Sequence, residues 1–284
     1  ALNSIKNIIG EHAGNVEGIL AEGMAAAYIN DSWTGTLIEI DLENGYWILV
    51  NDPSLTLSGI GSGYDPGRVY DLHGGPNLVS YPALGSSNIG ASIPDDVEYL
   101  FEAIIGEGMA AINIDGMVWA GTLTNFESGS GYWMIINEAL SFSYETGSMG
   151  RAEIEPYIET LPPGSAFNVT QSPNQAFYFV DEIILDEGGI EDGDWLLSYN
   201  KNVLTGIRQW QGVMIDIPAM GMDDSKLTAD YFEMGDVPIF KLLQQSTGEL
   251  IPLGGDIPDW TSNGAYALSG LAEMQPIPVT FMLN

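Results

Sequence analysis

The sequence predicts a mainly β protein in which tandem small β-rich modules, each with a short helix, precede a β-sandwich. Short segments rich in β-branched and aromatic residues recur between turn residues, and the 284 residues include 35 glycines and 15 prolines. The hexapeptides GYWILV (residues 45–50) and GYWMII (residues 131–136) indicate an internal repeat. A repeat of this kind sets the architecture, so it is traced before the single elements.

The repeat extends well beyond these hexapeptides. AEGMAAAYINDSWTGTL (residues 21–37) matches GEGMAAINIDGMVWAGTL (residues 106–123) after one insertion, and the two tryptophans are 86 positions apart (119 − 33). Upstream, Ile8 aligns with Ile93 at a shift of 85 (93 − 8). An accidental match in one order and spacing is improbable. We therefore expect a truncated first repeat module (1–57), a Gly-rich connector (58–75), a second repeat module (76–145), a linker (146–163) and a β-sandwich module (164–284).

The elements follow in order from local patterns. In the first copy, residues 3–20 predict a short helix, and AAAYIN, TGTLIEI and GYWILVN predict strands. In the second copy, NLVSYPAL (residues 77–84) predicts an opening strand, followed by a helical piece and the strands MAAINID, MVWAGTL, YWMIINE and LSFSYE. Residues 164–284 contain strand patterns at near-regular spacing, which is typical of a β-sandwich. KLLQQSTGELIPL predicts a hairpin with glycine in its turn.

The first copy has no room for an equivalent of NLVSYPAL after Ala1. Two explanations stay open. Ala1 is simply where a cleaved or ordered portion of the chain begins, or the missing strand comes from elsewhere, including from another chain.

Charge and cysteine content exclude several classes of function. The chain has 7 basic and 39 acidic residues, a net charge of −32, which repels nucleic acids and anionic membranes. The absence of cysteine excludes disulfides, thiolate nucleophiles and cysteine-zinc sites. No run of about 18 apolar residues occurs, so we expect no membrane insertion.

Catalytic patterns are poorly supported. The two histidines, His12 and His73, lie in the first copy and the connector, and no G-x-S-x-G, H-E-x-x-H or phosphate-binding glycine loop occurs. We expect a protein that is not an enzyme.

Acidic loops are candidates for Ca²⁺, the one cofactor that the sequence suggests. Oxygen-rich loops hold Ca²⁺ at millimolar concentrations, although neither loop here has EF-hand spacing. A solvated acidic surface is the alternative. The candidate metal ligands are Asp186, Glu187, Glu191, Asp192, Asp194, Asp223 and Asp224.

Repeated and aromatic residues supply further candidates. The equivalent tryptophans 33, 47, 119 and 133 predict core positions, and Gly45 and Gly131 predict turns with positive φ. Glu22 and Glu107 are equivalent carboxylates that either bind a cation or bond turn amides. Trp260, Trp210 and Tyr199 are candidates for stacking on sugar rings, with Trp260 in the loop GDIPDWTSNG the best candidate for exposure and Trp210 better suited to the core.

The pattern NLVSYP … IIGEGMAA … W-x-G-T-L … GYW resembles repeat modules of large secreted surface proteins of marine bacteria, although Pro76 stands where those modules carry a tryptophan. IEDGDWLLSYN … LTGIRQW … DIPAMG … GDVPIFKL is similar to the β-sandwich that precedes the sorting domain in proteins of type IX (Por) secretion, and PVTFMLN resembles the segment that leads into that domain. The resemblance implies an extracellular or cell-surface location. A virion surface, as in related phage proteins, is the alternative.

The leading hypothesis is a non-enzymatic structural subunit of an extracellular assembly or filament, whose partner is a further copy of itself. In its sharpest form, a strand from one subunit completes the first module of the next by β-strand addition. The candidate assembly strand is Pro278, Val279, Thr280, Phe281, Met282 and Leu283. The alternatives are an adhesion module that binds glycan or another surface polymer, and a fibre or decoration protein of a marine phage.

Overall fold

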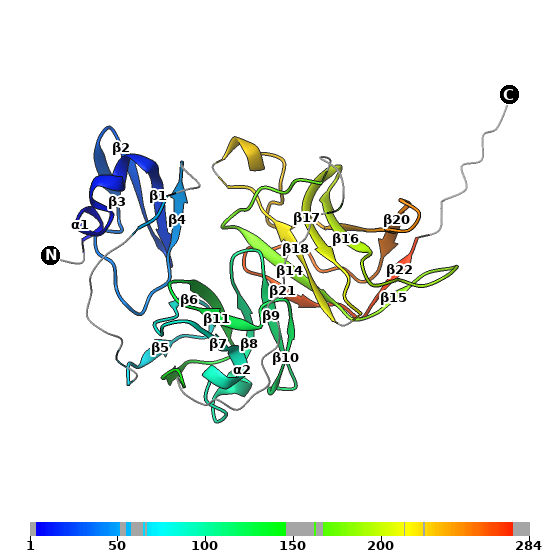
Figure 1. Cartoon of the computed structure of the whole chain (residues 1–284), viewed down its shortest axis with the longest axis horizontal. Coiled ribbons are helices and arrows are strands. Elements are labelled where there is room, and N and C mark those ends of the chain that lie inside the picture. Colours follow the sequence, from blue (N-terminus) through cyan, green and yellow to red (C-terminus); the bar gives the residue numbers. More distant parts are fainter. Residues whose placement is uncertain are drawn as a thin grey trace. The chain divides into compact units, whose positions relative to one another are not determined.

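Figure 1 shows the computed structural model of the chain, which divides into two compact units, Ala1–Tyr157 and Ile158–Asn284. The structure describes residues 4–51, 55–57, 65, 67–145, 162, 167–212, 214–223 and 225–274. Strands dominate both units, so the protein is mainly β, as the sequence predicts. The unit boundary falls inside the predicted linker, and both repeat copies lie in the first unit. No described helix has the length and hydropathy needed to span a bilayer.

The first copy of the repeat forms a four-stranded antiparallel sheet among the described residues, with strand order β3-β2-β1-β4. Ile5 and Ile9 are buried and share a hydrophobic core with Val16 and Ile19. The sequence predicts only a helix over residues 3–20, whereas the structure also contains β1 there, because pairing with two neighbours outweighs a glycine within the strand. The elements are α1 (Ile5–Ile9), the 3₁₀ helix η1 (Gly10–Asn15), β1 (Val16–Ala21), β2 (Met24–Ile29), β3 (Ser32–Gly35) and β4 (Trp47–Val50).

The second copy has the same sheet with one more strand, in the order β10-β9-β8-β12-β6. The added strand β6 pairs with β12 along its whole length, from Gly131 opposite Ser80 to Ile136 opposite Gly75. Two small two-stranded sheets, β11-β7 and β13-β5, accompany it. The elements are β5 (Tyr70–Leu72), β6 (Gly75–Ser80), β7 (Ser86–Asn88), α2 (Ile89–Ser92), η2 (Glu98–Leu100), β8 (Phe101–Ile105), β9 (Ala110–Ile114), β10 (Val118–Gly121), β11 (Asn125–Glu127), β12 (Gly131–Ile136) and β13 (Leu140–Phe142).

The predicted connector 58–75 contributes to this second core. Its residues Tyr70 and Leu72 are buried and lie in β5, and the Tyr70 ring meets the Tyr144 ring edge-on at 5.2 Å. Such edge-to-face contacts are the preferred geometry of aromatic pairs. The core of the second copy therefore begins before the predicted boundary at residue 76. Other members of its aromatic cluster are Tyr81, Phe126, Tyr132 and Phe142.

The tyrosine of each GYW motif fixes the loop that precedes it. Tyr46 Oη accepts a hydrogen bond from the Asp41 N–H at 2.8 Å, and Tyr132 Oη accepts one from the Glu127 N–H at 2.8 Å. The prediction of positive φ at the glycines of these motifs is wrong, since neither has it. The constraint is space: a Cβ atom on Gly45 would lie 3.0 Å from the carbonyl oxygen of Val79.

The tryptophans of the W-x-G-T-L motifs differ in their polar contacts. Trp33 and Trp119 both pack against the core of their own copy. Trp119 Nε1 donates to the buried Glu98 carboxylate at 2.7 Å. The aligned residue in the first copy is Ala13 (98 − 85), and Trp33 Nε1 is buried with no hydrogen-bond partner among the described residues.

The second unit places a three-stranded sheet, β18-β14-β21, and a six-stranded sheet, β15-β22-β20-β19-β16-β17, around one hydrophobic core. The arrangement is sandwich-like, and β19 and β20 form the predicted hairpin, with Gly248 at φ 73° in its turn. The elements are β14 (Gln175–Val180), β15 (Ile183–Ile184), β16 (Trp195–Asn200), β17 (Val203–Gln209), β18 (Ile215–Met220), η3 (Lys226–Thr228), β19 (Ile239–Leu243), β20 (Leu250–Gly254), β21 (Ala265–Ala267) and β22 (Leu271–Glu273).

An ion pair joins the two sheets of this unit. Arg208 Nη2 in β17 donates to Asp216 Oδ2 in β18 at 2.9 Å, and both side chains are fully buried. Arg208 Nε also donates to the Asp216 carbonyl oxygen at 2.8 Å. Buried charges persist only when paired and hydrogen-bonded, so this contact fixes how the sheets meet.

Candidate functional site

The outer edge of β4 is the feature that distinguishes the first copy from the second. β4 pairs with β1 in the same register in which β12 pairs with β8: Leu20 lies opposite Trp47, and Ile105 lies opposite Trp133. In the second copy, β6 occupies the other side of β12. Among the described residues, nothing pairs with the other side of β4, which stands at the edge of its sheet.

Side chains along this edge are exposed where their counterparts are buried. Ile48 is 39 % exposed, whereas its equivalent Met134 is 0 % exposed. Val50 is 42 % exposed, whereas its equivalent Ile136 is 2 % exposed. An open strand edge with apolar side chains is a template for pairing with another strand. We call Trp47–Val50 with this unpaired side the free edge.

The two copies meet through Glu22, in the turn after β1. Its Oε2 accepts a hydrogen bond from the Leu78 N–H in β6 at 3.1 Å, and its Oε1 lies 2.6 Å from His73 Nε2. His73 Nδ1 lies 2.8 Å from the Gly74 carbonyl oxygen. The contact with Gly74, and then that with Glu22, raises the pKa of His73 above its ordinary value of 6.5. Glu22 thus bonds a backbone amide, as one of the two sequence-based alternatives has it, but the amide belongs to the other copy.

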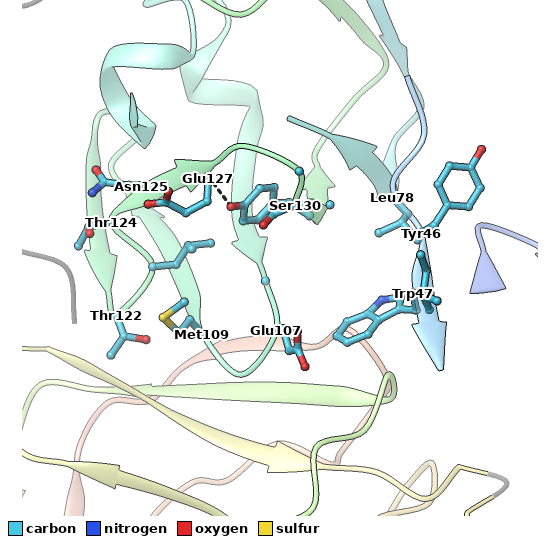
Figure 2. Close-up of a pocket in the computed structure, with 16 residues that line it drawn as sticks. Tyr46, Trp47, Leu78, Glu107, Met109, Thr122, Thr124, Asn125, Glu127 and Ser130 are labelled. Carbon is cyan, nitrogen blue, oxygen red and sulfur yellow. Dashed lines mark hydrogen bonds between the residues drawn. The ribbon is translucent and has the colours of Figure 1, made fainter. Parts of the chain in front are cut away.

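A cleft of about 520 Å³ lies beside the free edge, within the first unit. Figure 2 shows the Trp47 side chain extending from β4 toward Glu107, the equivalent of Glu22. A planar aromatic face next to hydroxyl, amide and carboxylate groups is a combination suited to a polar, ring-shaped ligand. Other residues that line the cleft are Met109, Thr122, Thr124, Asn125, Glu127 and Ser130.

Comparisons with known proteins assign no function to the chain. No family model matches the chain, and no significant match was found among curated proteins or solved structures. The resemblance to secreted surface proteins therefore stays a prediction from the motifs quoted above. The free edge and the adjoining cleft are the features on which a functional proposal can be built.

The acidic loop of residues 181–195 serves the fold in part. Asp194 is 2 % exposed, and its carboxylate accepts hydrogen bonds from the Glu191 N–H at 3.0 Å and the Gln245 N–H at 2.9 Å. Through these two hydrogen bonds, the Asp194 carboxylate connects the loop to the β19–β20 turn. Asp186, Glu187 and Asp192 lie on the exposed part of the same loop.

The second acidic candidate also has a structural role. Asp223 Oδ1 accepts a hydrogen bond from the Ser225 N–H at 2.8 Å, at the start of η3. Asp224 lies outside the described residues. Within the described ranges, no three histidine, aspartate or glutamate side chains converge to hold a metal ion. Ca²⁺ binding therefore stays a prediction, which calorimetric titration of CaCl₂ into the chain tests directly.

The predicted exposure of Trp260 is wrong. Trp260 is 4 % exposed, its indole N–H donates to the Ala219 carbonyl oxygen at 2.9 Å, and its ring stacks on Phe232. Trp210 is 7 % exposed and lies in the same core, as its alternative assignment predicts. Lys241 Nζ lies 4.4 Å from the centre of the Tyr199 ring, so a cation already covers that ring. These three residues do not converge on a described cleft, whereas Trp47, which sequence reasoning assigned to the core, lines one.

The candidate assembly strand, residues 278–283, lies outside the described residues. The structure therefore describes the free edge but does not test whether this segment forms a strand. The described part of the first copy contains no equivalent of NLVSYPAL, in agreement with the unpaired side of β4 among the described residues. No pattern pointed to the Glu22–His73 contact, because it joins residues of two different copies.

Proposed function

We propose that the protein is a non-enzymatic structural subunit of an extracellular assembly, and that copies join by β-strand addition to the free edge of β4. The observation that carries this proposal is the exposure of Ile48 and Val50 in a strand whose equivalent is covered by β6. Strand addition supplies main-chain hydrogen bonds and covers alternate side chains, which is what this edge lacks.

The resemblance to secreted surface proteins supports an extracellular location. The net charge of −32 also suits an assembly in a salty medium, where repulsion between copies is screened. When each copy uses one surface to bind a different surface of the next copy, the contact can repeat indefinitely. It produces an open filament unless the rotation between successive copies closes a ring, so it favours filaments over dimers.

Sedimentation velocity and negative-stain microscopy of the full chain in roughly 0.5 M NaCl, where the Debye length is about 4 Å, test the proposal. The wild-type chain should form oligomers or filaments. Ile48→Lys places a charge on the free edge and should reduce assembly at least tenfold, because charged residues on edge strands oppose pairing. Leu227→Lys, at a residue 74 % exposed in the second unit, is the matched control and should leave assembly unchanged. A wild-type chain that stays monomeric at every concentration would refute the proposal.

The cleft favours a second candidate, binding of a glycan or another surface polymer. Trp47 offers an aromatic face, and the hydroxyl and amide groups of Thr122, Thr124 and Asn125 line the same space. A glycan array followed by calorimetry should then identify a ligand whose affinity falls at least tenfold in Trp47→Ala. The buried Trp260 is no part of this cleft, and binding that survives Trp47→Ala would place the ligand elsewhere.

A further inference from the structure

One segment outside the described residues has the sequence pattern of β6. Residues 276–281 read PIPVTF, and residues 76–81, which begin within β6, read PNLVSY. The first proline and the valine are identical, and Thr280 and Phe281 stand where the second copy has Ser80 and Tyr81. This segment therefore resembles β6, the strand that pairs with the outer side of β12 in the second copy. The equivalent side of β4 in the first copy is unpaired among the described residues.

The two prolines of the segment fall where strand addition tolerates them. In β6, the N–H groups of Leu78 and Ser80 donate to acceptors of the first copy at 3.1 and 3.0 Å and so point away from β12. The Tyr81 N–H points the other way and donates at 3.0 Å to the residue before β12. Because N–H groups alternate along a strand, Pro276 and Pro278 replace N–H groups that pairing in this register does not use.

In the register of β6, the apolar side chains of the segment would lie on the face where the free edge leaves Ile48 and Val50 exposed. Val79 and Tyr81 are 3 % and 4 % exposed and face the core of the second copy. Their counterparts are Val279 and Phe281, and Ile277 shares their face because side chains two apart lie on one side of a strand.

The register of β6 also fixes the opposing pairs. Asn77 lies opposite Met134 in the second copy, which places Ile277 opposite Ile48 in the first. In the same register Val279 lies opposite Tyr46. Ile277 would then cover the exposed surface of Ile48 and lie diagonal to Val50, which itself lies opposite Gln275. Burial of apolar surface is the main favourable term in association.

We infer that residues 276–281 of one copy add to the free edge of a second copy, antiparallel to β4 and in the register of β6. This inference rests on the proposed function and names the occupant of its site. Residues 274–284 (MQPIPVTFMLN) contain no charged side chain, so the donor adds no repulsion at the surface of an acidic partner.

Register-specific cross-linking tests the inference, and the chain suits it because it has no cysteine of its own. Directly opposed residues of a hydrogen-bonded antiparallel pair have Cα atoms about 5.5 Å apart, a separation that a disulfide spans after mild oxidation. Full-length Ile48→Cys mixed with full-length Ile277→Cys should give a covalent dimer on a non-reducing gel. Ile48→Cys mixed with Thr280→Cys, which sits on the other face, should give at least fivefold less.

Equal yields from both mixtures, or no dimer from either, would overturn the register. A chain that carries Ile48→Cys and Ile277→Cys together should form a ladder of multimers. A cross-link found only within single chains would contradict donation between copies, because residues 276–281 would then pair with β4 of their own chain.

A pair of proline variants gives an independent readout. Val279→Pro removes an N–H that this register directs at β4 and should weaken assembly at least tenfold. Thr280→Pro introduces a proline at the neighbouring position and removes an N–H that this register directs away from β4, so assembly should change less than threefold. Equal effects of the two prolines would overturn the inference.

The outcomes also separate this inference from the proposed function. If Ile48→Lys abolishes assembly but Val279→Pro leaves it unchanged, a different strand occupies the free edge. In that case the inference fails and the proposed function stands. If the wild-type chain does not assemble at all, both the inference and the proposed function are refuted.

Discussion

Gly45 and Gly131, the first residues of the two GYW motifs, lie in direct contact within the first unit. A Cβ atom on Gly131 would lie 2.9 Å from Gly45 Cα and 3.3 Å from Tyr46 N. The repeat therefore conserves glycine at this position for the close approach of two backbones. At this point the two copies meet through equivalent residues, and backbone packs on backbone.

Gly131→Ala should lower the free energy of unfolding by about 1–3 kcal/mol, since an added methyl group must displace backbone. Urea denaturation followed by far-ultraviolet circular dichroism measures the change. Gly14→Ala is the matched control, because a Cβ atom on Gly14 meets nothing within 4 Å and should be tolerated. Equal stability of the two variants would show that the contact between the motifs is looser than described.

Trp119→Phe should cost more stability than Trp33→Phe. Trp119 donates its indole N–H to the carboxyl group of the buried Glu98, and a hydrogen bond within a protein contributes about 0.5–1.5 kcal/mol. Trp33 has no such partner among the described residues. The difference between the two variants in urea midpoints, read by circular dichroism, gives the contribution of this hydrogen bond. Equal losses would mean that ring packing alone decides the cost.

The contact between Glu22 and His73 should depend on pH. Because the pKa of His73 in the folded chain is raised above 6.5, its protonated form stabilises the contact. That contribution is fully present below pH 6.5 and is lost as pH rises through the raised folded-state pKa. The effect is small because the His73 side chain is 58 % exposed.

Titration of His73 by NMR measures this pKa in the wild type and in Glu22→Gln. Loss of the carboxylate should lower the pKa toward its ordinary value but not fully, since the Gly74 carbonyl oxygen remains. A His73 pKa that is the same in both would show that Glu22 does not hold the ring.

Asp216→Ala should destabilise the second unit by about 3–5 kcal/mol, because it leaves the buried Arg208 without its carboxylate. Chemical denaturation followed by Trp fluorescence reports the change. Asp192→Ala, on the exposed part of an acidic loop, is the control and should stay within about 0.5 kcal/mol of the wild type. A loss below 1 kcal/mol for Asp216→Ala would mean that water reaches the pair.

The mainly β class was predictable because it rests on local patterns. Alternating apolar residues and turn glycines locate strands such as β12 and the β19–β20 hairpin without knowledge of the rest of the chain. Likewise, the match between the two GYW segments predicts that β4 and β12 are equivalent strands, as their pairing shows.

Burial in loops and contacts between copies were not predictable in the same way. Trp260 lies in a loop, yet Phe232 and the Ala219 carbonyl oxygen come to it from distant parts of the chain. The short β5 carries too few residues to show a period. Glu22 looks the same as Glu107 in sequence, and only the placement of His73 and β6 separates their roles.

The pairing of residues 43–45 with residues 78–80 has a mechanical consequence. Gly45 N–H donates to the Leu78 carbonyl oxygen at 2.9 Å, and Ser80 N–H donates to the Glu43 carbonyl oxygen at 3.0 Å. Tension transmitted along the backbone through the two copies can cross directly from Glu43 to Ser80 through these bonds. Tension applied at the two ends of the first unit would then bypass the chain between them, which contains β4, for as long as these bonds hold.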